Sequence, residues 1–390
     1  MRAEEFRASV RAWLEANAPA PDEFPEPRTA EYVRFSQEFL GRVHRAGYSG
    51  ISWPIAYGGR GLGLPEEKAF WAEAAKFTLP LGLFGIGLGM CGPTILQLGT
   101  QQQRERYIAP MLRGEEIWCQ MFSEPAAGSD VASLRMRAER DGDHFVLTGQ
   151  KVWTTGAHYC DFGILLARTD RDVAKHRGLT MFIADMSAPG VVVRPLRDMT
   201  GAEHFNEVFF DEVRIPVEAV VGEIDGGWAA AHALLVHERL AVSAGLGMEG
   251  ESQGPLSYAG IVSRAREAGL LDDPLVVDEL VNLHLRSRAA EVVDAKLAQE
   301  MDCGIDPGSR GSIGKLLKAR LQSDAADLVV RLFGAAGLDV EVERAVLGSR
   351  QLSIGGGTNE IQLSIIGERV LGLPREPRID LNTPFHELRS

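Results

Sequence analysis

The sequence has few cysteines and a shortage of basic residues. Its four cysteines, among 390 residues, form no Cys-x-x-Cys pair and stand away from histidines at zinc-binding spacing. This argues against a disulfide scaffold or a structural metal site, and we expect no metal. Lysine and arginine total 41 against 54 acidic residues, giving a net charge of −13. Nucleic acid is therefore not expected as a partner, because phosphate binding needs a basic surface, although a local basic pocket stays open.

The first residues also lack a continuous apolar run. Charges are spread through MRAEEFRASVRAWLEANAP, so we expect no signal peptide and a cytoplasmic protein. One stretch without charge, 77–99, is long enough to span a bilayer. It contains Pro80, Pro93 and six glycines, which break a continuous helix. We therefore expect buried helices joined by a turn there, and no membrane span.

The spacing of apolar residues divides the chain into three regions. The first is helical, with one apolar face at Phe6, Val10, Trp13 and Leu14 and further helices over 29–46 and 66–77. From about residue 123 the pattern changes to short β-rich runs, at 144–148, 150–154, 162–169, 179–184, 191–195 and 206–215. After residue 226 the helical period returns, over 228–247, 274–299, 313–333 and 360–370.

This order predicts an α+β multi-domain protein. No long helical pattern interrupts the β runs, so an antiparallel sandwich or barrel is expected rather than parallel βαβ winding. The predicted domains are an N-terminal helical domain over 1–120, a middle β domain over 121–225 and a C-terminal helical bundle over 226–390. With 45 % hydrophobic and 24 % charged residues, the chain has enough apolar side chains for a large core.

One glycine motif matches the dinucleotide-binding fingerprint but lacks its context. Gly87, Gly89 and Gly92 lie in GLGMCG. The fingerprint needs a preceding strand and a following helix within a βαβ unit. Here Pro93 follows at once and the flanking pattern is helical. Close helix packing is the favoured interpretation, and a Rossmann site is the lesser alternative.

Two segments near the start of the β region could bind a flat polar ligand. In CQMFSEPAAGSD, Ser123 and Ser129 flank a tight turn. The serine hydroxyls and the backbone N–H groups of the turn could bind a flat polar heterocycle and a phosphate. In LTGQKVWTTGA, Trp153 could cover an aromatic ring and Thr155 could donate to a ring nitrogen. From these residues alone, an ordinary loop and a core tryptophan remain the alternatives.

Together the two segments resemble the paired flavin-binding motifs of the acyl-CoA dehydrogenase family. The resemblance covers nearly the whole chain, through WPIAYGGRGLG at Trp53, GPTILQLGTQQQRERYIAPMLRGE at Gly92, FNEVFFDEVRIPVEAVVGEIDGGW at Phe205 and GGGTNEIQLSIIGERVLGLP at Gly355. It implies an N-terminal α domain, a middle antiparallel β domain and a C-terminal four-helix bundle. It also implies FAD bound between the β domain and the bundle and reached in part by a neighbouring subunit.

The resemblance gives each residue of the two segments a role. Phe122 and Ser123 match positions at the pyrimidine edge of the flavin. Ser129 matches a position near the pyrophosphate and the thioester ligand. Trp153 would flank the flavin ring, and Thr155 would hydrogen-bond the N5 locus. These residues form the cofactor-binding set in the β region, with Ser129 shared by the substrate.

The C-terminal loop lacks the glutamate that many family members use as the catalytic base. Gly356 occupies the matching position, just before the Gly-Thr of the loop. Its backbone N–H could still donate to the thioester carbonyl of the substrate. Thr358 and Glu360 match adenosine-side contacts with FAD, which in the family a partner subunit usually supplies.

A second family arrangement supplies a base elsewhere. The isovaleryl and long-chain branches carry the glutamate on a bundle helix in a Glu-Arg-Leu context, and HERL places Glu238 and Arg239 there. Removing an α-proton needs a carboxylate over the α-carbon, with its pKa raised by burial. Glu238 lies four residues after Leu234 and three after Leu235, on an apolar helix face. A solvated carboxylate is the alternative, and Arg239 is structural or supports the CoA-facing end of the pocket.

The resemblance implies α,β-dehydrogenation of an acyl-CoA substrate to a 2-enoyl-CoA, in a homodimer, homotetramer or hetero-oligomer. The β-hydride would pass to flavin N5, and the electrons would continue to an electron-transfer flavoprotein. Two alternatives are a flavin oxidase or monooxygenase on the same fold and a non-catalytic scaffold subunit. Rapid anaerobic bleaching of the flavin by acyl-CoA, with slow reoxidation by oxygen, would distinguish a dehydrogenase from the oxidase or monooxygenase. A colourless purified chain would support the scaffold subunit.

Two stretches depart from the usual family pattern. SRAREAGLLDD, from Ser263, stands where an Arg-x-Thr/Ser-Phe-Gly stretch usually reaches the neighbouring FAD, and Arg331 stands near a usual glutamine. The adenosine-side contacts must therefore differ from the common ones. Similar departures occur in bacterial members that resemble steroid side-chain dehydrogenases, some of which pair unlike subunits. The substrate class stays open between fatty acyl and polycyclic thioesters.

Overall fold

The described part of the protein forms two compact units. The computed structural model describes residues 3–243, 254–303, 305, 307–334, 337–377 and 382–388. Unit 1 is drawn from Met1–Leu196, Glu203–Ala241 and Arg378–Ser390, and unit 2 from Arg197–Ala202 and Val242–Pro377. Within the described ranges, no helix is long and apolar enough to cross a bilayer.

Unit 1 begins with helices, as the apolar spacing predicts. Their bounds are Ala3–Asn17 (α1), Ala30–Arg45 (α2), Leu64–Ala74 (α3), Gly92–Leu98 (α4) and Gln101–Leu112 (α5). The apolar face of α1 is buried with side chains of α2 and α3, including Phe6, Phe39 and Phe70. The Thr29 hydroxyl caps α2 by accepting a hydrogen bond from the backbone N–H of Tyr32 at 3.1 Å, as expected for a threonine at a helix start.

The GLGMCG glycines lie at a close helix contact. Residues Gly87–Cys91 form a π-helical turn that continues directly into α4, and the fully described stretch 3–117 holds no strand before it. A Cβ on Gly92 would lie 2.3 Å from the Trp53 ring and 2.8 Å from the Met111 sulfur. Packing therefore explains this motif, and the Rossmann alternative is wrong because the strand it requires is missing.

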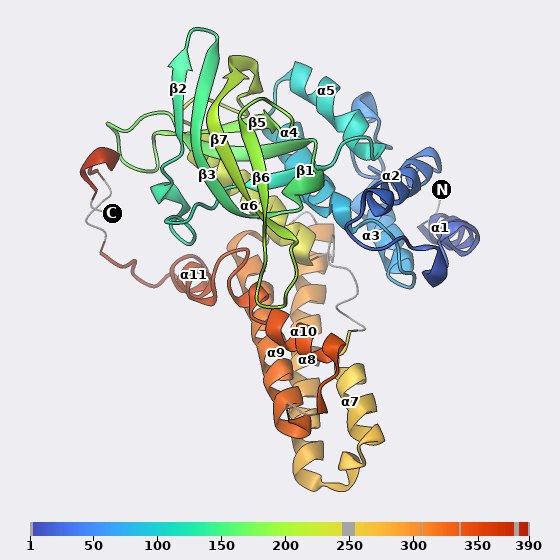
Figure 1. The fold of residues 1–390 in the computed structure, drawn as a ribbon. Coiled ribbons are helices and arrows are strands. Elements are labelled where there is room, and N and C mark those ends of the chain that lie inside the picture. The colour runs from blue at the N-terminus through green and yellow to red at the C-terminus, as the bar shows by residue number, and fades with distance from the viewer. Residues whose placement is uncertain are drawn as a thin grey trace. The chain divides into compact units, whose positions relative to one another are not determined.

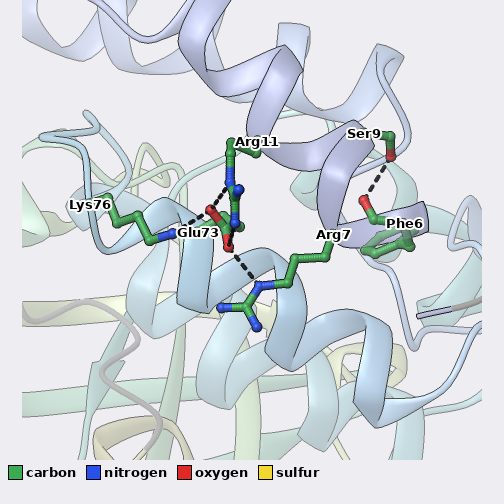
Figure 2. A network of polar contacts seen from close by, with 6 residues as sticks. All are labelled: Phe6, Arg7, Ser9, Arg11, Glu73 and Lys76. Carbon is green, nitrogen blue, oxygen red and sulfur yellow. Dashed lines mark hydrogen bonds and ion pairs between the residues drawn. The ribbon is translucent and has the colours of Figure 1, made fainter. Parts of the chain in front are cut away.

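A buried carboxylate joins α1 to α3. Glu73 is fully buried, and its oxygens accept hydrogen bonds from Arg7 at 2.6 Å, Arg11 at 2.9 and 3.0 Å and Lys76 at 2.6 Å (Figure 2). Hydrogen bonds from these cations, that of Arg11 first, hold the pKa of Glu73 far below its usual value of 4.5. Burial acts in the opposite direction but is outweighed.

We expect Glu73→Gln to lower the stability of the protein and to weaken its acid dependence. Because the pKa of Glu73 is depressed in the folded state, its ionised carboxylate contributes fully to stability above pH 4.5, the usual pKa. This contribution is lost progressively as the pH falls below that value. The variant should therefore unfold at lower urea than wild type near about pH 7, with the gap narrowing toward about pH 3. Glu38→Gln, an exposed glutamate of α2, is the control. An equal gap at both pH values would contradict this account.

A seven-stranded sheet follows the helices. Its strands are Trp118–Met121 (β1), Arg137–Asp141 (β2), His144–Thr155 (β3), Phe162–Arg168 (β4), Leu179–Asp185 (β5), Val191–Leu196 (β6) and Phe205–Pro216 (β7). The strand order is β1-β4-β2-β3-β7-β6, with β5 paired to β4. The β2-β3-β7-β6 part of this order can be followed by its labels in Figure 1. Most pairs are antiparallel as predicted, but β1 runs parallel to β4, and β2 meets β4 in parallel at one residue pair. The β2–β3 hairpin between β1 and β4 supplies the long connection that a parallel return requires.

Helices return after the sheet. The first, Gly227–Ser243 (α6), belongs to unit 1 up to Ala241, and the predicted extension over 244–247 lies outside the described residues. Unit 2 holds Tyr258–Glu267 (α7), Pro274–Asp302 (α8), Gly311–Phe333 (α9), Val340–Gly348 (α10) and Asn359–Ile365 (α11). The long helices α8 and α9 run side by side, and α7 to α10 share one buried cluster (Figure 1). The predicted helix–sheet–helix order is confirmed.

Candidate active site

The two predicted ligand-binding segments lie next to each other in unit 1. The backbone N–H of Val152 on β3 donates to the Ser123 carbonyl at 3.0 Å, and Lys151 Nζ donates to the Phe122 carbonyl at 3.2 Å. Phe122 is buried and Ser123 is half-buried. These bonds fix the start of the serine loop, residues 122–134, to the part of β3 that leads into Trp153.

Trp153 stands at an irregular point of β3 with an unusual backbone. The register with β7 shifts between Lys151 and Thr154, and Trp153 has a φ of +60°. Its side chain is 55 % exposed, and its ring meets Phe205 edge-to-face at 5.5 Å. A bulky residue in the left-handed region is strained, and such strain gathers at ligand sites. The core interpretation of Trp153 is therefore wrong, because the bulge turns this residue out of the core.

Beyond the bulge, a network of hydrogen bonds holds Thr155 in place. Thr155 is half-buried and is the antiparallel partner of Phe205, the first residue of β7. The buried Asn206 side chain donates to the Thr154 carbonyl at 3.0 Å, and the N–H of Gly156 donates to the His204 carbonyl at 2.8 Å. These contacts replace the ladder bonds that the bulge disrupts. The backbone that presents Trp153 and Thr155 is thus tied to β7 at Thr154 and held at Gly156 by the His204 carbonyl.

The serine loop contains the tight turn that the sequence predicts. Glu124 and Ala127 exchange two backbone hydrogen bonds of 3.0 Å, which leaves Ser129 exposed just beyond the turn. The next residue, Asp130, accepts from Ser133 Oγ at 2.5 Å and from Lys175 Nζ at 2.8 Å. Burial alone would raise the pKa of Asp130, but these hydrogen bonds outweigh it and lower the pKa.

A buried ion pair that the sequence reasoning missed fastens the serine loop to β3. Lys151 Nζ lies 2.8 Å from Glu124 Oε1, and the two side chains are 0 % and 7 % exposed. The same carboxylate accepts from the N–H groups of Arg135 at 2.6 Å and Met136 at 3.0 Å. Burial lowers the pKa of Lys151, and Glu124 opposes that shift. A signal was present, because Lys151 is in phase with the inward-facing residues of β3.

Helix α6 contributes to the same buried core as the serine loop. Ala230, Ala231 and Leu234 of α6 belong to one cluster with loop residues such as Phe122 and Ala127. Its N-terminus is set close to β5, since a Cβ on Gly227 would lie 2.6 Å from the Leu179 carbonyl oxygen. Both α6 and the serine loop are therefore anchored in the core of unit 1.

Glu238 follows one turn after Leu234 on α6. Its side chain is half-buried, consistent with a position at the edge of the apolar face. The preceding His237 lies 3.0 Å from the Gln97 Oε1 of α4, and burial lowers the pKa of His237. The neutral imidazole thus links α6 to α4 on one side of Glu238. The side chain of Arg239 lies outside the described residues.

In unit 2, the C-terminal loop explains why glycine stands at 356. Gly356 and Gly357 have φ of +64° and +90°, a conformation that favours glycine over a residue with a side chain. Gln362 Nε2 donates to the carbonyls of Gly356 at 2.9 Å and Gly357 at 3.3 Å, and Lys315 Nζ donates to that of Gly357 at 2.5 Å. A glutamate at 356 would be strained by this backbone, whereas glycine adopts it freely.

Thr358 and Glu360 lie at the start of α11. The Thr358 hydroxyl accepts from the Ile361 N–H at 3.3 Å and caps the helix. Glu360 is exposed, and hydrogen bonds from its own backbone N–H and from Thr358 lower the pKa of its carboxyl group. This carboxylate is therefore charged and open to a ligand.

Comparison of the sequence with models of known protein families identifies the family of this chain. The N-terminal, middle and C-terminal domain models of acyl-CoA dehydrogenase match residues 2–115, 119–213 and 225–371. The chain belongs to the acyl-CoA dehydrogenase family. As a member of this family the protein is an oxidoreductase, and the predicted family and fold class are both confirmed.

Individual acyl-CoA dehydrogenases give the same result. IpdE1 of Mycobacterium tuberculosis is 37 % identical over 96 % of this chain and 99 % of its own length. FadE34 of the same organism is 42 % identical over 83 % of this chain, which spans only 44 % of FadE34. The solved structure of the Tcur3481-Tcur3483 steroid ACAD has a TM-score of 0.80 and 29 % identity, covering 96 % of this chain and 98 % of that chain.

The residues of unit 1 fit a flavin, the cofactor typical of acyl-CoA dehydrogenases. A flat heterocycle needs an exposed aromatic face and hydroxyl donors close to it. The exposed Trp153, the half-buried Thr155 and the fixed Ser123 provide these groups within one short stretch of bonded backbone. The chemistry of this donor set is therefore suitable for an isoalloxazine ring.

Proposed function

We propose that the protein oxidises an acyl-CoA thioester to the 2-enoyl-CoA, with FAD as cofactor and Glu238 as the base. The observation that supports this most directly is that the Glu238 helix and the serine loop contribute to one buried cluster of unit 1. That loop is bonded to the strand that presents Trp153 and Thr155. The carboxylate and the proposed ring-binding residues thus belong to one compact unit with a shared core.

In this proposal the chain performs the proton chemistry and the positioning. The Glu238 carboxylate takes the α-proton, which leaves the electron pair of the broken C–H bond to form the new double bond. Bound FAD supplies the acceptor for the β-hydrogen, which leaves with two electrons. Phe122, Ser123, Trp153 and Thr155 would hold the flavin ring. The backbone N–H of Gly356 would donate to the thioester oxygen and stabilise its developing negative charge.

The outer contacts of the ligands complete the proposed site. Ser129 would bind near the pyrophosphate and the thioester, and Arg239 would support the CoA end of the pocket. Thr358 and Glu360 would contact the adenosine side of FAD in a neighbouring subunit. The charge and exposure of Glu360 support such a contact across an interface.

The proposed partners follow from the same relatives. The name of the steroid ACAD above, Tcur3481-Tcur3483, combines two protein designations. This supports a hetero-oligomer for this chain, beside the homodimer or homotetramer. It also favours a bulky polycyclic acyl group over a simple fatty acyl chain as the substrate. An electron-transfer flavoprotein is the proposed acceptor of the electrons from reduced FAD.

We expect the purified protein to be yellow and to lose its flavin absorbance when an accepted thioester is added without oxygen. A panel of steroid side-chain, branched and straight-chain acyl-CoA thioesters should be tested under these conditions. Reoxidation should be slow with oxygen and fast with an electron-transfer flavoprotein. A chain that binds no FAD, alone or with a related partner subunit, would contradict the proposal. Bleaching followed by fast reoxidation with oxygen would favour an oxidase instead.

A further inference from the structure

We propose that the segment 382–388 positions the serine loop, with Phe385 acting through the buried Arg168. This inference rests on the proposed function, because it assigns the segment a role in binding the ligand at Ser129. Phe385 is then a positioning residue that need not touch substrate or FAD. The segment belongs to the same compact unit as the serine loop.

Arg168 is a buried cation that binds the end of the serine loop. It lies at the end of β4 and is 2 % exposed. Its Nη2 donates to the carbonyls of Ala132 at 2.6 Å and Leu134 at 3.3 Å, and its Nη1 donates to that of Lys175 at 2.6 Å. A buried guanidinium that bonds three carbonyls fixes their positions strongly. Arg168 therefore holds the serine loop against the turn that carries Lys175.

No carboxylate pairs directly with Arg168 among the described residues, and its Nε has no hydrogen-bond partner there. Burial lowers the pKa of Arg168 to about 10, so the group stays protonated near neutral pH. The carboxylates of Glu124, Asp170 and Asp130 favour the charged form from a distance, but none of them covers the guanidinium plane. The Phe385 ring adds a cation–π contact on that plane, because the guanidinium carbon lies 3.9 Å from the ring centroid.

Backbone contacts attach the 382–388 segment to the turn after β4 and so place Phe385 beside Arg168. The Phe385 N–H donates to the Val173 carbonyl at 2.8 Å, and the His386 N–H donates to that of Arg171 at 3.1 Å. Pro384 forms a β-bridge with Ala174. The segment is thus attached to the turn after β4 by one β-bridge and two backbone hydrogen bonds. The ring of Phe385 closes the cation site from outside, at 9 % exposure.

The serine loop is consequently held at both ends by buried cations. Lys151 binds its start at Phe122 and Glu124, and Arg168 binds its end at Ala132 and Leu134. Ser129 lies between the two clamps and is exposed. Loosening the second clamp should let Ser129 move away from its binding position while Glu238 and Trp153 stay in place.

The test compares Phe385→Leu, which keeps the apolar bulk but loses the ring, with Phe385→Tyr, which keeps the ring. Glu387→Gln is the control, because its exposed carboxyl group contacts His386 of the same segment rather than Arg168 or the turn after β4. We expect Phe385→Leu to raise the KM for the accepted thioester about 10-fold with kcat changed less than about twofold. Phe385→Tyr and Glu387→Gln should stay near wild type. An unchanged KM in Phe385→Leu, or equal defects in the Leu and Tyr variants, would overturn the inference.

Hydrogen exchange separates this inference from the proposed function. In the full chain, the backbone amides of 129–136 should exchange faster in Phe385→Leu than in Phe385→Tyr. This comparison needs no substrate, so it remains decisive if no thioester reduces the flavin. Equal exchange in the two variants would show that Phe385 only anchors the 382–388 segment.

Discussion

Glu238→Gln should retain yellow FAD and lose the reduction of that FAD by acyl-CoA, by a factor of about 10² to 10⁴. The amide has nearly the same size as the carboxyl group, so the buried cluster that α6 shares with the serine loop should survive. It cannot accept the α-proton, and the electron pair that must form the double bond is then not released. The rate of flavin bleaching after rapid anaerobic mixing with the thioester measures the loss.

The matched control for this variant is Glu223→Gln, an exposed glutamate just before α6. It removes the same charge from the same region and should bleach at the wild-type rate. Glu238→Asp should retain part of the activity, because the shorter carboxylate remains a base but is displaced by about one methylene. A Glu238→Gln variant with the wild-type bleaching rate would remove this residue from the mechanism. Loss of FAD from the variant would instead indicate a structural role.

Lys151→Met should lower the free energy of unfolding by about 3–5 kcal/mol, because it leaves the Glu124 carboxylate buried without its cation. The protein should also bind less FAD, since Phe122 and Ser123 of the serine loop are fixed to β3 beside this pair. Urea unfolding and the ratio of flavin to protein measure the two effects. The double variant Lys151→Met/Glu124→Gln should recover part of the stability, because it buries no unpaired charge and the amide oxygen can still accept from one of the two N–H groups, that of Arg135 or that of Met136.

A second lysine in the same region supplies the control. Lys175 lies 2.8 Å from Asp130, the same distance as in the Lys151–Glu124 pair, but the Asp130 side chain is 54 % exposed. Water stabilises the carboxylate left behind, so Lys175→Met should cost only about 0–1 kcal/mol. Equal losses in the two variants would mean that burial does not set the strength of the Lys151–Glu124 pair.

The fold could be predicted because its signals are local. Apolar residues at helical spacing gave α1 to α3, and short β-rich runs bounded by turn residues gave β4 to β7. The glycine-rich stretch before α4 could be separated from a Rossmann motif because no strand pattern precedes it. The parallel pairing of β1 with β4 was not predicted, since it joins strands 44 residues apart in register, from Trp118 to Phe162. Such a pairing depends on the whole sheet and leaves no mark in either strand.

The sequence by itself determined the family, the helix–sheet–helix order and the residue types available for catalysis. Motifs in sequence order are enough for this, because each one reflects a short piece of backbone or a side chain that the chemistry needs. Only the tertiary structure decided that Trp153 faces outward in a left-handed backbone and that Lys151 and Arg168 are buried. It also decided that Phe385 covers Arg168. These features depend on burial and on contacts between residues up to 217 positions apart, from 168 to 385. Burial changes the cost of a charge by more than any local pattern can indicate.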